Sequence, residues 1–153
     1  MPKIDLAAIP QSNRTRYPPP YDTPVQGRWV RRLAGPGGLT VMGAAHVTLA
    51  PGAWSSQRHW HAEEDELLVV LSGEAVLVED EGETVLRAGD VAAWPKGVRN
   101  AHHLQNRSAA DCTLLAVSAG DAARDWGEYP DIDLKFSGDL YLHKDGTPYP
   151  PKD

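Results

Sequence analysis

Short apolar and polar stretches, separated by many turn residues, predict a chain built from β-strands. Residues 39–49 alternate between apolar and polar positions well enough for a strand, and residues 29–33 fit a shorter edge strand. Residues 35–38, Gly-Pro-Gly-Gly, give a strong turn signal between the two. Residues 66–73 are instead apolar on both faces, which indicates that either a second sheet or another subunit covers their outer face.

A β-hairpin is predicted in the middle of the chain. Residues 74–78 and 84–86 have the composition of two strands, and they flank Glu-Asp-Glu-Gly-Glu at residues 79–83. We interpret this acidic run as a solvated turn without a role in a functional site.

The distribution of proline and glycine, with 13 and 14 residues among 153, divides the chain into three parts. The length predicts one domain. We expect an irregular N-terminal arm at residues 1–27, a central β-domain at residues 28–120 and a C-terminal tail at residues 121–153, which packs on the domain without a core of its own. The arm is interpreted as a passive extension; the alternatives are a lid and a segment exchanged with a neighbouring subunit.

Charge and composition narrow the classes of partner. A formal net charge of −6 argues against nucleic acid and anionic membranes. No apolar run approaches the length of a membrane span, and the first residues lack the features of a secretory signal. The single cysteine, Cys112, lies in an apolar strand and fits a packed core thiol in a reducing compartment. We therefore expect a cytoplasmic protein whose partners are a small-molecule substrate and a second copy of itself in a homodimer.

Two histidines and a glutamate form the first candidate site. His59 and His61 are two residues apart, so on a strand their imidazoles project from the same face. Glu66 follows His61 by five residues, an odd offset that would place it on the opposite face of an uninterrupted strand. The polar residues 62–65 provide a break, after which the carboxylate can return to the two imidazoles. This arrangement predicts a metal site on a β-scaffold.

A further ligand is expected from the adjacent pair His102 and His103. Neighbouring strand residues point to opposite faces, so only one of the two can join the site. His102 is favoured because it lies in phase with Leu104 and Asn106, and His103 is the alternative.

The two segments resemble the paired motifs of the cupin superfamily. The residues that match the first motif are Gly52, His59-Trp60-His61, Glu66 and Gly73, and those that match the second are Gly89, Pro95-Lys96-Gly97, His102 and Asn106. There is one extra residue before His59, and four residues instead of two precede His102. The resemblance covers residues 40–118. It implies an all-β fold, the cupin double-stranded β-helix or jelly-roll barrel, with a metal bound by His59, His61, Glu66 and His102.

The tail carries a second resemblance. Asp131-Ile132-Asp133 follows Tyr129-Pro130, and the chain closes on Lys-Asp-Gly-Thr-Pro-Tyr at residues 144–149. This is similar to a group of small bacterial cupins, some of which are labelled sugar-phosphate-isomerase-like by analogy.

Three imidazoles and one carboxylate leave open positions on a divalent metal, so the ligand set suits a catalytic rather than a closed structural site. We expect one ion of Zn, Mn, Ni or Fe per chain. Such an ion would promote isomerase, epimerase or lyase chemistry on a hydroxy-carbonyl or carbohydrate substrate by acting as a Lewis acid. With iron, the same site would suit a dioxygenase. A cupin that binds a sugar without turning it over is the third alternative, and histidines that hold no metal are the fourth.

Other residues have weaker signals. The candidate acid or base residues are Glu64, His46 and Tyr141. Trp54, Trp60 and Trp94 lie near the motifs, but Trp60 points away from the face shared by His59 and His61, which favours a packing role. The arginines that could meet an anionic group of a ligand are Arg58 and Arg99.

Overall fold

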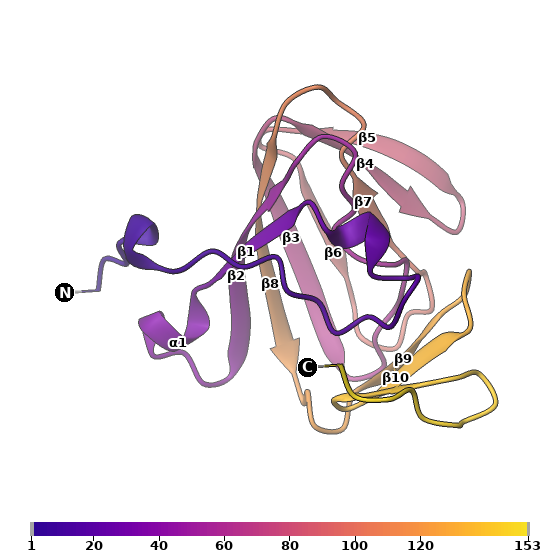
Figure 1. The fold of residues 1–153 in the computed structure, drawn as a ribbon. Coiled ribbons are helices and arrows are strands. Elements are labelled where there is room, and N and C mark those ends of the chain that lie inside the picture. Colours follow the sequence, from indigo (N-terminus) through magenta and orange to yellow (C-terminus); the bar gives the residue numbers. More distant parts are fainter. Residues whose placement is uncertain (1, 153) are drawn as a thin grey trace.

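Two antiparallel β-sheets face each other in the computed structural model, which describes residues 2–152 (Figure 1). The first sheet has the order β1-β2-β8-β3-β6, with β1 Arg28–Arg32, β2 Met42–Leu49, β3 Glu64–Ser72, β6 Val91–Trp94 and β8 Cys112–Gly120. The second has the order β5-β4-β7, with β4 Glu74–Glu79, β5 Gly82–Arg87 and β7 His103–Gln105. The all-β jelly-roll prediction is confirmed, and β1 is the predicted edge strand.

The main core fills the space between these sheets. Every second residue of each strand points inward, as the period of two requires. The buried apolar side chains include Val47, Leu49, Leu68, Val70 and Leu114 from the first sheet and Ala75, Leu77, Leu86 and Leu104 from the second. Cys112 is fully buried in the same cluster, which confirms its packing role.

One inward-facing row of the first sheet places the candidate site at the end of this core. Glu66 of β3 pairs with Trp94 of β6 on one side and with Ser118 of β8 on the other. Gly43 of β2 continues the row, and a Cβ there would lie 2.7 Å from Ser118 Oγ. A glycine at this position therefore leaves room for the side chain of Ser118, the neighbour of Glu66 in the row.

The predicted hairpin forms between β4 and β5, with a tighter turn than expected because the strands extend to Glu79 and from Gly82. Its acidic tip is not merely solvated, which corrects the prediction. Glu79 Oε1 accepts hydrogen bonds from Trp94 Nε1 and Asn100 Nδ2, both at 2.9 Å, and Asp80 forms an ion pair with Arg58. The reason is that the hairpin folds back over the loop before β7, which the local sequence pattern does not indicate.

The C-terminal tail has regular structure that the sequence pattern did not predict. The tail forms a third sheet, in the order β11-β10-β9, from β9 Trp126–Tyr129, β10 Leu134–Ser137 and β11 Leu140–Leu142 (Figure 1). Its buried side chains share a second apolar cluster with the arm, made of Tyr17, Val25, Tyr129, Leu134 and Phe136. At Gly127, an added Cβ would lie 2.0 Å from the carbonyl oxygen of Trp60, so the tail touches the loop that carries the candidate histidines.

The N-terminal arm lies against its own chain. Ser12 and Val30 exchange backbone hydrogen bonds of 3.0 and 2.8 Å, and two short 3₁₀ helices lie on either side of this contact, η1 at Leu6–Ala8 and η2 at Thr23–Val25. The predicted turn before β2 contains a single helical turn, α1 at Ala34–Gly37. Exchange of the arm with a neighbouring subunit, and the exact domain boundaries at residues 28 and 120, stay predictions.

The outer face of the first sheet is open to solvent in the single chain. Leu67, Leu71 and Val91 are 40%, 47% and 57% exposed. The second sheet therefore does not cover the outside of β3, and cover by another copy in a homodimer stays a prediction. Within residues 2–152, no helix has the length and apolar character needed to cross a membrane.

Candidate metal centre

Backbone pairing brings the two motif segments together. His59 and His102 form an isolated antiparallel bridge, in which each backbone N–H donates to the carbonyl of the other residue, at 3.2 and 2.9 Å. His59 and His61 lie in an extended loop before β3, so they share a face as expected. The break before Glu66 is shorter than predicted, because β3 already begins at Glu64.

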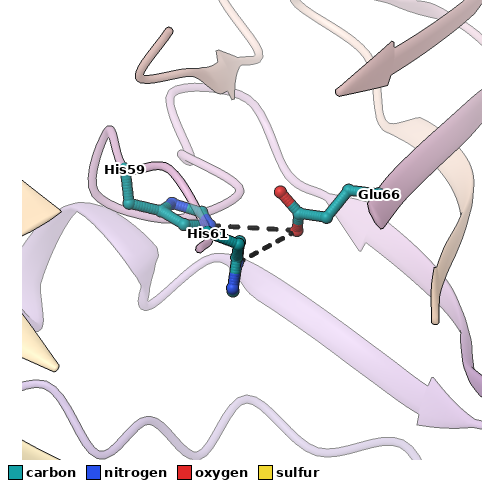
Figure 2. Close-up of side chains that lie close together, drawn as sticks. All are labelled: His59, His61 and Glu66. Atoms are coloured by element: carbon teal, nitrogen blue, oxygen red, sulfur yellow. Dashed lines mark ion pairs between the residues drawn. The ribbon is translucent and has the colours of Figure 1, made fainter. Parts of the chain in front are cut away.

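Three imidazoles surround the carboxylate of Glu66. His102 Nε2 lies 2.7 Å from Glu66 Oε2, while His61 Nε2 and His59 Nε2 lie 3.4 and 3.8 Å from Glu66 Oε1. Figure 2 shows His59 and His61 directed at this carboxylate. Burial would raise the pKa of Glu66, but the hydrogen bonds from the three histidines outweigh it and hold the pKa well below the ordinary value. The carboxylate is therefore ionised, as a metal ligand must be.

The other ring nitrogen of each histidine has an acceptor of its own. Nδ1 of His59 lies 2.8 Å from the carbonyl oxygen of Gln57, and Nδ1 of His102 lies 3.0 Å from that of Asn100. Nδ1 of His61 lies 2.5 Å from Asp125 Oδ2. Nδ1–H donates to these acceptors, so Nε2 is the ring nitrogen of each histidine that faces Glu66. The acceptors thus orient the three rings for ligation of a metal through Nε2.

These residues fit a divalent metal ion. One ligand atom from each of His59, His61 and Glu66 lies within 4.8 Å of the others. Imidazole nitrogens and a carboxylate oxygen suit zinc, manganese, nickel and iron alike, so the donor set does not select among them. His102 adds a third imidazole on the same carboxylate and stacks flat on Trp94, with ring centroids 3.8 Å apart.

His103 is directed elsewhere. Its Nδ1 donates to the carbonyl oxygen of Ser56 at 2.8 Å, and its Nε2 lies 3.0 Å from the side-chain amide of Gln105. Its ring meets Trp54 edge to face, at a centroid distance of 4.8 Å. Both ring nitrogens of His103 thus have partners other than Glu66, which supports His102 as the fourth ligand.

We predict that His102→Ala lowers metal affinity by about 10-fold to 100-fold or more, since even loss of a partner outside the ligand set typically costs that much. His103→Ala, the adjacent matched control, should leave affinity within a few-fold of wild type. Competition with a chelating dye measures both. The reverse ranking would make His103 the ligand.

Asp125, which sequence reasoning missed, supports His61 from the tail. It is 3% exposed, and its second carboxylate oxygen accepts a hydrogen bond of 2.8 Å from the backbone N–H of Glu63. Burial would lower the pKa of His61, but hydrogen bonds to Glu66 and Asp125 outweigh it and raise the pKa to about 9. The carboxylate therefore fixes both the ring of His61 and the loop that holds it. No motif spacing marks this residue, since 64 positions separate it from His61.

Asp125→Asn should weaken metal binding by about 10-fold to 100-fold, the usual cost of losing such a partner. An amide has one acceptor oxygen, so it cannot serve both His61 Nδ1–H and the N–H of Glu63. Asp121→Asn, at an exposed position nearby, is the control. Metal titration of the two variants checks this, and equal affinities would remove Asp125 from the site.

The three acid or base candidates have different positions. Glu64 Oε2 lies 3.8 Å from His61 Nδ1, and burial raises the pKa of Glu64. Glu64 and Tyr141 line one small cavity of about 180 Å³ together with His59 and His61. His46 lies on the outward face of β2, next to Arg31, and lines none of the cavities described here. The structure therefore brings Glu64 and Tyr141 to the site and leaves His46 outside, because the inward positions of β2 are Ala45 and Val47.

A larger cavity of about 780 Å³ opens beside the histidines. His59, Glu66, His102 and Trp94 line it at one end. Trp60 is buried against Trp126 at a centroid distance of 5.1 Å, consistent with the packing role expected for it. The arginines singled out in the sequence are engaged elsewhere: Arg58 forms ion pairs with Asp80 and Asp131, and Arg99 lies over the ring of Trp60.

Comparison with known proteins agrees with this geometry. The Cupin domain family matches residues 45–118. A sugar phosphate isomerase of the cupin superfamily from Silicibacter pomeroyi is 38% identical, with a TM-score of 0.90 over 97% of each chain. A proposed sugar phosphate isomerase from Acidithiobacillus ferrooxidans is 25% identical, with a TM-score of 0.67 over 80% of this chain and 74% of its own. A polyketide cyclase from Streptomyces resistomycificus, 18% identical with a TM-score of 0.64 over 79% and 80%, shares the fold. No curated protein matches the chain.

Proposed function

This chain belongs to the cupin superfamily, and from that premise we propose that it is a metal-dependent enzyme for a small hydroxy-carbonyl or carbohydrate substrate. The observation that carries the proposal is the convergence of three Nε2 atoms on one partly buried, ionised carboxylate that lines a cavity of about 780 Å³. A cavity of this size holds a small molecule. The reaction class is isomerisation, epimerisation or β-elimination.

The metal ligands in this proposal are His59, His61, Glu66 and His102. A divalent ion held by them would polarise a carbonyl or hydroxyl oxygen of the substrate and so acidify the neighbouring C–H bond. Asp125 and the carbonyl groups of Gln57 and Asn100 accept hydrogen bonds from the Nδ1 atoms and so hold the three imidazole rings in a fixed orientation. Because these supports are part of the folded chain, little reorganisation is needed when substrate binds.

Glu64 is the proposed general base. It lies beside His61 in the small cavity that Tyr141 also lines, and His59 lines both this cavity and the larger one. In the proposal the reacting carbon of the substrate lies near His59, and Glu64 takes its proton. A partly buried carboxylate is a stronger base than an exposed one, because desolvation disfavours its charged form. Tyr141 lines the same cavity, and the proposal assigns to it the return of a proton to a substrate oxygen.

The substrate class follows from the cavity and from the relatives. Trp94 and the imidazole of His102, stacked on each other, line the cavity beside Glu66, and an aromatic lining suits a sugar-like ring or chain. Two of the similar solved proteins are described as sugar phosphate isomerases. Both features support a carbohydrate or related hydroxy-carbonyl compound.

Exchange of a substrate C–H with deuterated water tests the proposal. Metal-loaded protein incubated with a panel of sugars, hydroxy acids and their phosphates should incorporate deuterium into at least one compound, without consuming oxygen. Oxygen uptake by iron-loaded protein, without exchange, would instead indicate a dioxygenase. Saturable binding with neither reaction would leave a sugar-binding protein.

A further inference from the structure

A group of arginines from the arm and the first strand lines the same cavity as the candidate metal ligands. Arg28 and Arg32 alternate with Val30 along β1, so all three face the inner side of the sheet. Arg14 enters from the arm, which crosses β1 at the bridge between Ser12 and Val30. The cavity thus has a carboxylate and imidazoles at one part of its wall and guanidinium groups at another.

None of Arg14, Arg28 and Arg32 forms an ion pair with a carboxylate in residues 2–152, whereas Arg58 and Arg107 both do. Arg28 is the most constrained of the three. Its Nη1 donates to the carbonyl oxygen of Ser55 at 2.8 Å, while its Nε is buried and has no hydrogen-bond partner within the described chain. A buried donor without an acceptor costs free energy, so an anionic group that reached this Nε from the cavity would relieve that cost.

A second hollow, of about 480 Å³, extends this cationic region. It shares Arg14, Arg28 and Arg32 with the main cavity and adds Arg16 and Lys152. Lys152 is already paired with Asp22, so the free charge comes from the arginines. In a chain of net charge −6, cations gathered in one recess are not explained by overall composition. A recess lined by one sign of charge attracts ligands of the opposite sign.

We propose that Arg14, Arg28 and Arg32 bind an anionic group, a phosphate or a carboxylate, on the substrate whose hydroxy-carbonyl part meets the metal centre. The guanidinium fork matches both groups and can bind them with two parallel hydrogen bonds. This inference rests on the proposed function, because the hydroxy-carbonyl part of the substrate is the part that would bind at the metal centre. It also gives the arm a role, because Arg14 brings part of the binding site across the cavity.

The test uses metal-free protein, so that no metal contributes to anion binding. Calorimetric titration with inorganic phosphate and, separately, with acetate should show saturable binding of at least one. Arg28→Met and Arg14→Met should each weaken it by about tenfold, the effect of losing one charge-assisted hydrogen bond. Arg87→Met, an exposed residue of β5 outside both hollows, is the matched control and should bind as wild type does.

Preference for phosphate would identify a phosphate monoester as the substrate class, and preference for acetate a carboxylate. Failure of wild-type protein to bind either anion, or equal binding by wild type, Arg28→Met and Arg14→Met, would overturn the inference. Arg14 is exposed, so Arg14→Met keeps the test valid if Arg28→Met does not fold. Anion binding is measured without metal, so its absence would not count against the proposed metal centre. The metal content of wild-type protein tests that centre separately.

Discussion

Replacing His59 by alanine should abolish metal retention. Nδ1 of His59 donates a hydrogen bond to the carbonyl oxygen of Gln57, and its Nε2 is directed at Glu66. The substitution therefore removes a ligand atom that the chain already holds in position. We expect affinity to fall by more than about 100-fold, the upper end of the effect of outer-sphere substitutions, because a direct ligand is lost. Elemental analysis after dialysis against metal-free buffer gives the metal content per chain.

His143→Ala is the control for this experiment. His143 lies in the tail, where it stacks on Tyr149 and pairs with Asp133, and it contacts none of the candidate ligands. The control should keep the wild-type metal content. If His59→Ala also keeps it, His59 is not a ligand.

Glu64→Gln should reduce substrate C–H exchange by roughly 10² to 10⁴-fold, the contribution typical of a general acid or base. The amide has nearly the shape of the carboxylate but cannot accept the proton. Metal content should stay near that of wild type, because Glu64 is outside the proposed ligand set. Deuterium incorporation and elemental analysis on the same sample separate the two effects.

Glu63→Gln is the matched substitution one residue earlier. The Glu63 side chain is directed at Lys96, with 3.6 Å between the charged atoms, and it lines neither cavity at the site. It should exchange at the wild-type rate. Full activity in Glu64→Gln would assign the proton transfer to another group, and Tyr141 would be tested next.

Local periodicity was enough to predict how the candidate metal ligands are grouped. His59 and His61 share a face because the chain around them is extended, even though they precede β3 rather than lie within it. The phase argument also separated His102 from His103, because adjacent residues of an extended chain must diverge. In each case neighbouring residues decide the geometry, and the sequence contains that information.

Contacts between distant segments could not be predicted in this way. Asp125 reaches His61 only because the tail forms a sheet, and β-pairing across the chain leaves no local periodic signal at an aspartate. The arginines show the same limit. Arg58 and Arg99 were candidates because they lie near the motifs in sequence, but Arg58 is paired with carboxylates and Arg99 lies over an aromatic ring. The arginines that line the cavity include Arg28 and Arg14, which are distant from the motifs in sequence.

The most direct measurement for the central claim is the metal content of wild-type protein purified without chelator and without a nickel affinity step. The account predicts about one divalent ion per chain, held through dialysis, in line with a single cluster of three imidazoles and one carboxylate. Zinc, manganese or nickel would favour the Lewis-acid reactions. Iron would favour the dioxygenase alternative, which oxygen uptake tests. Protein that holds no metal even after reloading would contradict the account.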